Sequence, residues 1–225
     1  KRMTRKAEVY IGVDEVGRAA KRRASSKTIF VGIDEVGRGP LAGPITVGAV
    51  ALIINTRQKA MSDKFLRGIR DSKKLTPIKR EEWYAALRNE SRFTIACVSV
   101  NHTVIDKKGL SYAARFAVAK CLKKISQDLG VSGDRFQVLL DAGLFAPVEY
   151  QQERIIKGDE KIPLIAAASI IAKVTRDKYM TRIHKKYSQY GFMKHKGYGT
   201  SAHIALIKKY GLSGIHRKTF CTRII

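Results

Sequence analysis

Adjacent carboxylates at the end of an apolar run are the feature that most constrains how this 225-residue chain can fold. The apolar run 29–33 leads into Asp34 and Glu35, and a second apolar run, 138–140, ends at Asp141. A single carboxylate at a strand end is more often a turn-former or a helix cap than part of a site. Two such strand ends in one sheet are typical of the ligand site of an α/β protein. The pattern therefore predicts a buried sheet with an acidic edge.

The order of β-rich and helical segments indicates a mixed sheet. Strands are predicted over residues 29–34, 45–54, 93–100, 136–141 and 150–156. Helices are predicted over residues 77–90, 110–129 and 165–187, with part of a fourth at 205–209. The first three strands are expected to form an antiparallel meander. Strands first and strand–helix alternation afterwards indicate an α/β fold with a mixed sheet.

The direction of each acidic side chain decides whether the carboxylates can meet. Asp34 and Glu35 would point to opposite faces if both lay strictly within a strand, so we expect one of them at the strand's end. Asp177 falls in the long predicted helix and shares a face with Lys173, four residues before it. This spacing allows a plain Lys–Asp pair. Because residues 164–172 are apolar all round, it also allows a carboxylate that faces a site.

Carboxylates gathered in one place repel one another unless cations neutralise them. Their oxygens are hard ligands, which suit Mg²⁺ or Mn²⁺ and not zinc. Two such ions roughly 4 Å apart can activate a water and stabilise the leaving oxygen of a phosphodiester. An acidic, metal-filled centre in a basic chain therefore predicts nucleic-acid hydrolysis.

The charge of the chain favours a polyanionic partner. The formal net charge is +25, and residues 1–28 contribute only nine Lys or Arg against three acids. After Asp177 the chain has eleven Lys or Arg and no acid. Such a one-signed segment attracts nucleic acid with salt-dependent affinity. The alternative is a solvated basic surface without a nucleic-acid partner.

The three cysteines and the hydropathy pattern bear on the cellular compartment. Cys97, Cys121 and Cys221 lack the spacing of metal ligands, which favours buried thiols in a reducing cytosol. The longest apolar run, 45–54, is about half of what a membrane span needs. No secretory signal is visible. We therefore expect a cytoplasmic location and no membrane contact.

Six sequence strings occur in the order of a known family. They are GIDEVGRGPLAGP (32–44), DSKKL (71–75), LLD (139–141), AAASIIAKVTRD (166–177), YGFMKHKGYGT (190–200) and IHRKTF (215–220). On these strings, residues 29–220 resemble the type-2 ribonuclease H enzymes, the ribonuclease HII family. The resemblance implies an α/β, RNase H-like fold with a mixed five-stranded sheet flanked by helices, plus a C-terminal helical segment.

The resemblance also implies a metal-dependent endoribonuclease. Its cofactor would be Mg²⁺ or Mn²⁺. Its partners would be RNA–DNA hybrid duplexes and DNA containing ribonucleotides, cut to leave 3′-hydroxyl and 5′-phosphate ends, and a monomer is expected. One alternative is a ribonuclease HIII-type enzyme, against which stand the short N-terminal extension and Asp177 in place of the expected glutamate. The other is a non-catalytic, basic nucleic-acid-binding protein.

The resemblance assigns roles to residues at matching positions. The four catalytic, metal-binding carboxylates of the family correspond to Asp34, Glu35, Asp141 and Asp177. The family has a loop that reads the ribose 2′-hydroxyl, a loop near the substrate backbone, and a tyrosine on the junction sugar. These positions correspond to Gly37, Arg38, Gly39, Ser72, Lys73 and Tyr198. Without the family, the last three would be read as a solvated turn and a ring in a Gly-rich loop.

A near copy of the acidic motif lies twenty residues upstream. Residues 11–18 share six of eight residues with 31–38, but the upstream Asp14 and Glu15 are not followed by an equivalent of Gly39. We therefore assign function to the second copy. The chain is divided into an inactive basic N-terminal extension (1–28), an RNase H-like catalytic domain (29–178) and a basic C-terminal helical segment (179–225).

Overall fold

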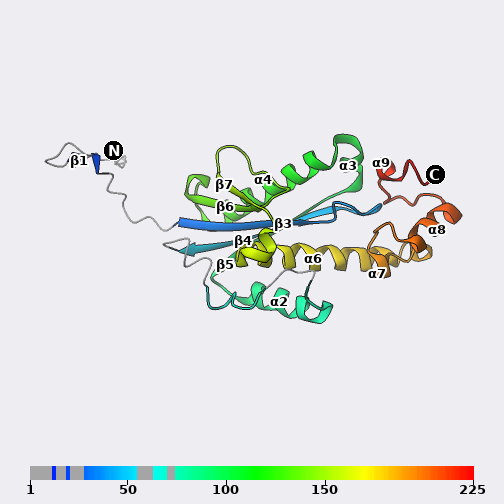
Figure 1. The fold of residues 1–225 in the computed structure, drawn as a ribbon, viewed down its shortest axis with the longest axis horizontal. Helices are drawn as coiled ribbons and strands as arrows, with labels where there is room; N and C mark the ends of the chain where they lie inside the picture. Colours follow the sequence, from blue (N-terminus) through cyan, green and yellow to red (C-terminus); the bar gives the residue numbers. More distant parts are fainter. Residues whose placement is uncertain (1–11, 14–18, 21–27, 55–62, 70–73) are drawn as a thin grey trace, which may run out of the picture.

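The computed structural model of the chain describes residues 12–13, 19–20, 28–54, 63–69 and 74–225 (Figure 1). Ser72 and Lys73, predicted near the substrate backbone, lie outside these residues, as do Asp14 and Glu15. The strands are β1 (Gly12–Val13), β2 (Ala19–Ala20), β3 (Thr28–Val36), β4 (Ile45–Ile54), β5 (Phe93–Val100), β6 (Phe136–Asp141) and β7 (Gln151–Ile155). The α-helices are α2 (Pro77–Asn89), α3 (His102–Lys108), α4 (Leu110–Leu129), α5 (Gly158–Lys161), α6 (Pro163–His184), α7 (Phe192–His195), α8 (Ser201–Tyr210) and α9 (Lys218–Cys221).

Five strands form one mixed sheet in the order β5-β4-β3-β6-β7. β3 pairs with β4 and β4 with β5, both antiparallel, as the predicted meander requires. β6 pairs with β3 and β7 with β6, both parallel. The predicted α/β fold with a mixed five-stranded sheet is therefore confirmed.

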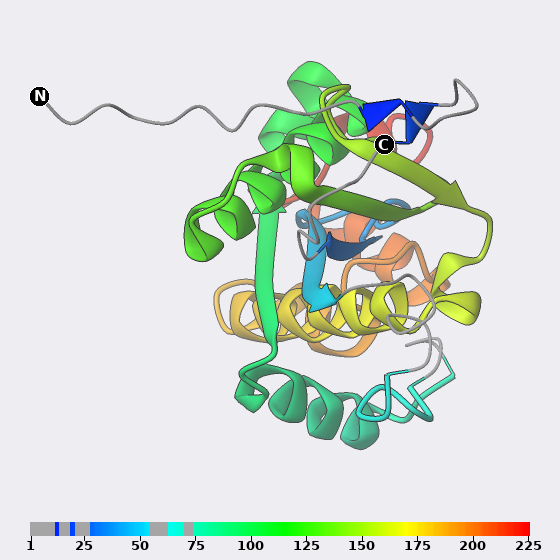
Figure 2. The ribbon, with the colours of Figure 1, turned by 90° about the vertical axis from the view of Figure 1, so that its left-hand side faces the viewer.

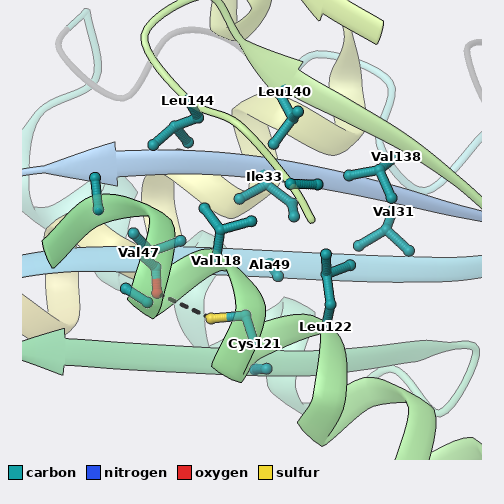
Figure 3. Packing of buried hydrophobic residues seen from close by; sticks show 14 of the residues in the cluster. Val31, Ile33, Val47, Ala49, Val118, Cys121, Leu122, Val138, Leu140 and Leu144 are labelled. Atoms are coloured by element: carbon teal, nitrogen blue, oxygen red, sulfur yellow. Dashed lines mark hydrogen bonds between the residues drawn. The ribbon is translucent and has the colours of Figure 1, made fainter. Parts of the chain in front are cut away.

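Helices cover both faces of this sheet (Figure 2). α4 packs on one face, where its buried side chains meet the strands in a large apolar core (Figure 3). In that core the Cys121 thiol lies 3.6 Å from the carbonyl oxygen of Val47. α6 covers the opposite face, with α2 outside it (Figure 1). α7 packs against the C-terminal part of α6, and α8 and α9 lie at the same end of the molecule (Figure 1). None of the described helices has the length and apolar character to cross a membrane.

Two glycines let α6 lie directly on the backbone of the central strands. A Cβ on Gly32 of β3 would stand 2.3 Å from the carbonyl carbon of Leu164, and a Cβ on Gly48 of β4 would stand 2.3 Å from the carbonyl oxygen of Ala168. Neither distance is compatible with a side chain. This close crossing brings Ser169 of α6 within hydrogen-bonding reach of Asp34.

Some predicted details differ from the structure. The helix predicted over 165–187 runs from Pro163 to His184. The short helices α3, α5, α7 and α9 were not predicted, because one or two turns show too little of an apolar period.

The expectation that Asp34 or Glu35 lies at a strand end was wrong. Both are paired within β3, opposite Gly48 and Val47, since β4 keeps β3 regular as far as Val36.

Candidate active site

Three carboxylates from two neighbouring strands gather at one edge of the sheet. Asp34, Glu35 and Asp141 each offer an oxygen, and these oxygens all lie within 4.8 Å of one another. Ile33 pairs with Leu140 in parallel register, so the next residues, Asp34 and Asp141, lie side by side. β6 ends at Asp141, which leaves the edge of β3 open beside Glu35. The longer Glu35 side chain reaches the other two carboxylates around this open edge.

Asp34 is the most enclosed of the three, with 5 % of its surface exposed. Its Oδ1 accepts a hydrogen bond from the backbone N–H of Glu35 at 2.8 Å, and Ser169 also bonds to the carboxylate. Burial first, and then the charges of Glu35 and Asp141, raise the pKa of Asp34 well above its ordinary value. The protein alone therefore disfavours a fully ionised cluster.

Glu35 has one oxygen that needs a partner. Its Oε1 lies 3.3 Å from Nη1 of Arg38, whereas its Oε2 is buried and has no hydrogen-bond partner among the described residues. Burial and the charge of Asp141 raise the pKa of Glu35, and Arg38 opposes this shift. An unsatisfied buried carboxylate oxygen is costly, so its position has to be explained by something that binds there.

Asp141 is held by the segment that follows β7. Its Oδ1 accepts a hydrogen bond from the backbone N–H of Gly158 at 2.9 Å. Gly158 is the first residue of α5, and a Cβ there would stand 2.7 Å from Cδ1 of Ile165, so a side chain would require the Ile165 side chain to shift. This contact fixes the carboxylate beside Asp34.

The donor set fits a hard divalent cation. It consists of carboxylate oxygens alone, and one of them, Oε2 of Glu35, is orphaned inside the cluster. Such oxygen-only sites suit Mg²⁺, Ca²⁺ or Mn²⁺. A cation would satisfy the orphaned oxygen and offset the repulsion that raises both pKa values.

Asp177 lies outside this cluster of three. Its Oδ1 accepts a hydrogen bond from Nζ of Lys173 at 3.0 Å, which is the plain i,i+4 pair that the spacing allows. Asp177 also lines a groove of about 790 Å³ between α2 and α6, together with the basic side chains of Arg80, Arg182 and Lys185. Its assignment as the fourth catalytic carboxylate stays a prediction.

The predicted ribose-reading residues lie next to the cluster. Gly37 has φ +98°, which favours glycine, and Gly39 is exposed with open space around the position of a Cβ. Arg38 lies between them and contacts Glu35. Tyr198, the tyrosine predicted to pack on the sugar, is 40 % exposed. The Tyr198 loop (residues 196–200, between α7 and α8) meets the glycine loop (residues 37–44, between β3 and β4). The contact is a hydrogen bond from the backbone N–H of Leu41 to the carbonyl oxygen of Gly197 at 2.8 Å.

Two arginines near this site were missed by sequence reasoning. Arg176 and Arg217 are fully buried and hydrogen-bond to the glycine loop. The only signal for them was their place in two of the family strings, next to Asp177 and within IHRKTF. No apolar period or charge pattern predicts a buried arginine.

The sequence model of the family described as Ribonuclease HII matches residues 31–223. The chain belongs to the ribonuclease HII family. The ribonuclease HII of Geobacillus thermodenitrificans is 42% identical over 213 residues, covering 95% of this chain and 68% of that protein. The ribonuclease HII of Coxiella burnetii is 39% identical over 213 residues, with 94% and 88% covered.

Solved structures agree with this membership. Ribonuclease H2 of Pyrococcus horikoshii has a TM-score of 0.62 at 26% identity, covering 87% of this chain and 96% of that one. The ribonuclease HII solved in a PCNA complex from Archaeoglobus fulgidus has a TM-score of 0.61 at 27% identity, covering 86% and 94%. A ribonuclease HIII in complex with Mn²⁺ has a TM-score of 0.64 at 18% identity, covering 89% and 70%, and shares the fold.

Membership of the ribonuclease HII family settles the class of activity. The chain is a metal-dependent endoribonuclease of the ribonuclease H type, a family that uses divalent metals and acts on RNA–DNA hybrids. Membership of this family argues against the two alternatives, a non-catalytic nucleic-acid-binding protein and a ribonuclease HIII-type enzyme.

Proposed function

We propose that this chain cleaves RNA in RNA–DNA hybrids and at single ribonucleotides embedded in duplex DNA, leaving 3′-hydroxyl and 5′-phosphate ends. The observation that carries the proposal is the cluster of Asp34, Glu35 and Asp141, with its orphaned Glu35 oxygen, beside the exposed backbone of Gly39. A cation site and an open glycine loop at one place suit a phosphodiester that neighbours a ribose.

We assign the binding of two Mg²⁺ or Mn²⁺ ions to Asp34, Glu35, Asp141 and Asp177. When bound, such ions would activate a water and stabilise the leaving oxygen of the phosphodiester. Gly158 and Ser169 hold two of the carboxylates in place by hydrogen bonds. Lys173 holds Asp177 toward the groove between α2 and α6, on the side from which the substrate backbone would enter.

Recognition of the ribose is assigned to the glycine loop and to Tyr198. Only glycine leaves the backbone N–H and C=O groups bare enough to contact a sugar closely, and the 2′-hydroxyl distinguishes RNA from DNA. Arg38 is half exposed, so it can contact substrate while its Nη1 stays on Glu35. Ser72 and Lys73 remain assigned to the substrate backbone by the family resemblance alone.

Basic charge would hold the duplex against this site. The C-terminal segment 179–225 and the extension 1–28 each carry an excess of Lys and Arg over acids. Neutralisation of phosphates by such segments makes affinity fall steeply as salt rises. We propose that the enzyme works as a monomer, with residues 29–178 as its catalytic domain.

The test is cleavage of a duplex DNA that contains one ribonucleotide, and of a uniform RNA–DNA hybrid, in Mg²⁺ and in Mn²⁺. The chain offers a matched control, because Asp14 and Asp34 occupy equivalent positions in the two motif copies. We expect Asp34→Asn to abolish cleavage and Asp14→Asn to leave it unchanged. Cleavage that survives Asp34→Asn but not Asp14→Asn would refute the assignment, and no cut of the embedded ribonucleotide in either metal would refute the proposed substrate.

A further inference from the structure

Two buried arginines lie beneath the loops that we assign to ribose recognition. Arg176 of α6 and Arg217, just before α9, each have 0 % of their surface exposed. Their guanidinium hydrogen bonds go to backbone carbonyls, and neither arginine forms a salt bridge within the described part of the chain. Arginines buried for stability usually pair with a carboxylate, so these two call for another explanation.

Arg217 holds the glycine loop at three points. Its Nε donates to the carbonyl of Gly43 at 3.0 Å, its Nη1 to that of Arg38 at 2.8 Å, and its Nη2 to that of Gly37 at 2.6 Å. In addition, its backbone N–H donates to the carbonyl of Leu41 at 2.8 Å. The path of the loop between β3 and β4 is therefore dictated by one planar group.

Arg176 joins the glycine loop to the Tyr198 loop. Its Nε and Nη2 donate to the carbonyls of Pro44 and Ala42 at 3.0 and 3.2 Å. Its Nη1 donates to the carbonyl of Lys196 at 3.0 Å, and its guanidinium carbon lies 5.8 Å from the centre of the Tyr198 ring. One side chain thus contacts both loops and the ring that is exposed for the sugar.

The two loops pack so closely on each other and on Arg176 that neither Gly37 nor Gly197 has space for a side chain. A Cβ on Gly37 would stand 2.4 Å from Nε of Arg176, and a Cβ on Gly197 would stand 2.5 Å from the carbonyl oxygen of Ala42. Both glycines also have positive φ, of +98° and +87°. The loops therefore fit each other and the guanidinium in one arrangement.

A pair of buried histidines fixes the far side of the Tyr198 loop. The N–H of Ser213 donates to Nδ1 of His216 at 2.8 Å, so the ring proton of neutral His216 sits on Nε2. That proton faces Nε2 of His203 at 3.0 Å, and His203 in turn uses Nδ1 to donate to the carbonyl of Tyr198 at 2.9 Å. Tyr198 is thus held from both sides.

We propose that Arg176 and Arg217 are positioning residues for ribose recognition, which set the glycine loop and Tyr198 at a fixed separation. The inference rests on the proposed function, because it assumes that these two loops read the ribose. A guanidinium offers donors in a rigid fork toward several carbonyls, whereas a lysine ammonium is a single point on a flexible stem. Lysine should therefore preserve the charge and lose the positioning.

The experiment compares wild type with Arg176→Lys and Arg217→Lys. Fluorescence anisotropy measures the affinity for two duplexes, one all DNA and one with a single ribonucleotide, in Ca²⁺, with the duplexes checked on a gel to be intact. Wild type should bind the ribonucleotide duplex about tenfold more tightly, the value of one or two good hydrogen bonds. Both variants should lose this preference while their affinity for the all-DNA duplex changes by less than about twofold, because the charge is unchanged.

Tyr190→Phe is the control for a general loss of stability. This change removes the hydrogen bonds from the Tyr190 hydroxyl to the carbonyls of Tyr210 and Gly211, at 3.3 and 2.9 Å, neither of which belongs to the glycine loop or the Tyr198 loop. It should lower Tm and keep the preference for the ribonucleotide. The preference is a ratio of two affinities measured on one preparation, so an unfolded fraction in a variant cancels from it.

The outcomes separate this inference from the function on which it rests. A wild type without preference for the ribonucleotide would refute the proposed ribose reading. A wild type with the preference, together with lysine variants that keep it, would overturn the positioning role and leave the proposed function standing. Lysine variants that do not fold at all would also overturn it, because the arginines would then serve the fold alone.

Discussion

Asp34 and Asp141 lie side by side on parallel neighbouring strands, one register step beyond the pair Ile33 and Leu140. With Glu35 they bring three carboxylate oxygens within 4.8 Å of one another. A folded chain that gathers acids in this way gives up stability for a site, since burial and mutual repulsion raise the pKa values of Asp34 and Glu35.

Asp34→Asn should separate activity from stability. Loss of a carboxylate that we assign to the metal should lower kcat/KM on a ribonucleotide-containing duplex more than about 100-fold, beyond the usual effect of residues that merely support ligands. In metal-free buffer the same variant should be more stable by about 1 kcal/mol, because a buried and repelled charge is removed. Steady-state kinetics and thermal unfolding in EDTA measure the two effects. A variant that loses activity and stability together would indicate damage to the fold instead.

Divalent metal should stabilise the wild type through the carboxylate cluster. A ligand that binds only the folded state raises its stability by about 2.7 kcal/mol at a hundredfold excess over Kd. We expect Mg²⁺ or Mn²⁺ to raise Tm and EDTA to reverse the effect, with little response in Asp34→Asn or Glu35→Gln. Asp128, which pairs with Lys124 on the surface of α4, provides a control carboxylate. Asp128→Asn should keep the full metal response. An equal response in all variants would place the metal elsewhere.

The sheet and the approach of Asp34 to Asp141 could be predicted because their signal is local. An apolar run followed by a carboxylate marks a buried strand that carries an acid, and parallel pairing of two such strands brings Asp34 and Asp141 together. That Glu35 joins them was not predictable from alternation, because it depends on the open edge of β3 beyond Asp141.

The long-range contacts of the site could not be predicted. Arg176 and Arg217 bond to carbonyls 132 and 180 residues away in sequence, at Pro44 and Gly37. Backbone carbonyls carry no residue-specific signal, so nothing in the composition of the loop announces these partners. The pairing of Asp177 with Lys173 was foreseen as one of two alternatives, and the spacing alone could not choose between them.

Gly32→Ala should lower the stability of the fold much more than Gly39→Ala. The new Cβ on Gly32 would collide with the backbone of Leu164 at 2.3 Å, and the resulting shift of α6 should cost about 3 kcal/mol. Gly39 has open space around that position, so its substitution should change stability by less than about 0.5 kcal/mol. Chemical denaturation measures both values.

The same Gly39→Ala change tests the assigned role of the loop. A methyl group on the exposed side of Gly39 would hold the sugar away from the backbone, and a misplacement of this size should lower cleavage at an embedded ribonucleotide by about tenfold or more. Unchanged stability with unchanged cleavage would show that the sugar does not approach this glycine.

The histidine pair behind Tyr198 should make the fold sensitive to acid. Burial, first of all, lowers the pKa of His203 to about 4 and that of His216 to about 4, from 6.5 in an exposed chain. Between these values the unfolded chain binds protons that the folded chain rejects, so stability is complete above pH 6.5 and falls as the pH drops toward 4. We expect a loss of about 3 kcal/mol for each histidine over this window, because one pKa unit is worth about 1.4 kcal/mol.

Thermal unfolding from pH 7.5 to 4.5 measures this loss, and His216→Gln separates it from other titrations. Glutamine can accept the N–H of Ser213 and donate toward His203 without titrating, so the slope of Tm against pH should fall by about half. His102 is a matched control: it is only partly buried and lies outside the ring stack of His195, His203 and His216. His102→Gln should leave most of the slope. Equal slopes in wild type and His216→Gln would mean that the pair is protonated in the folded protein, and the neutral hydrogen-bond chain that holds Tyr198 would then be incorrect.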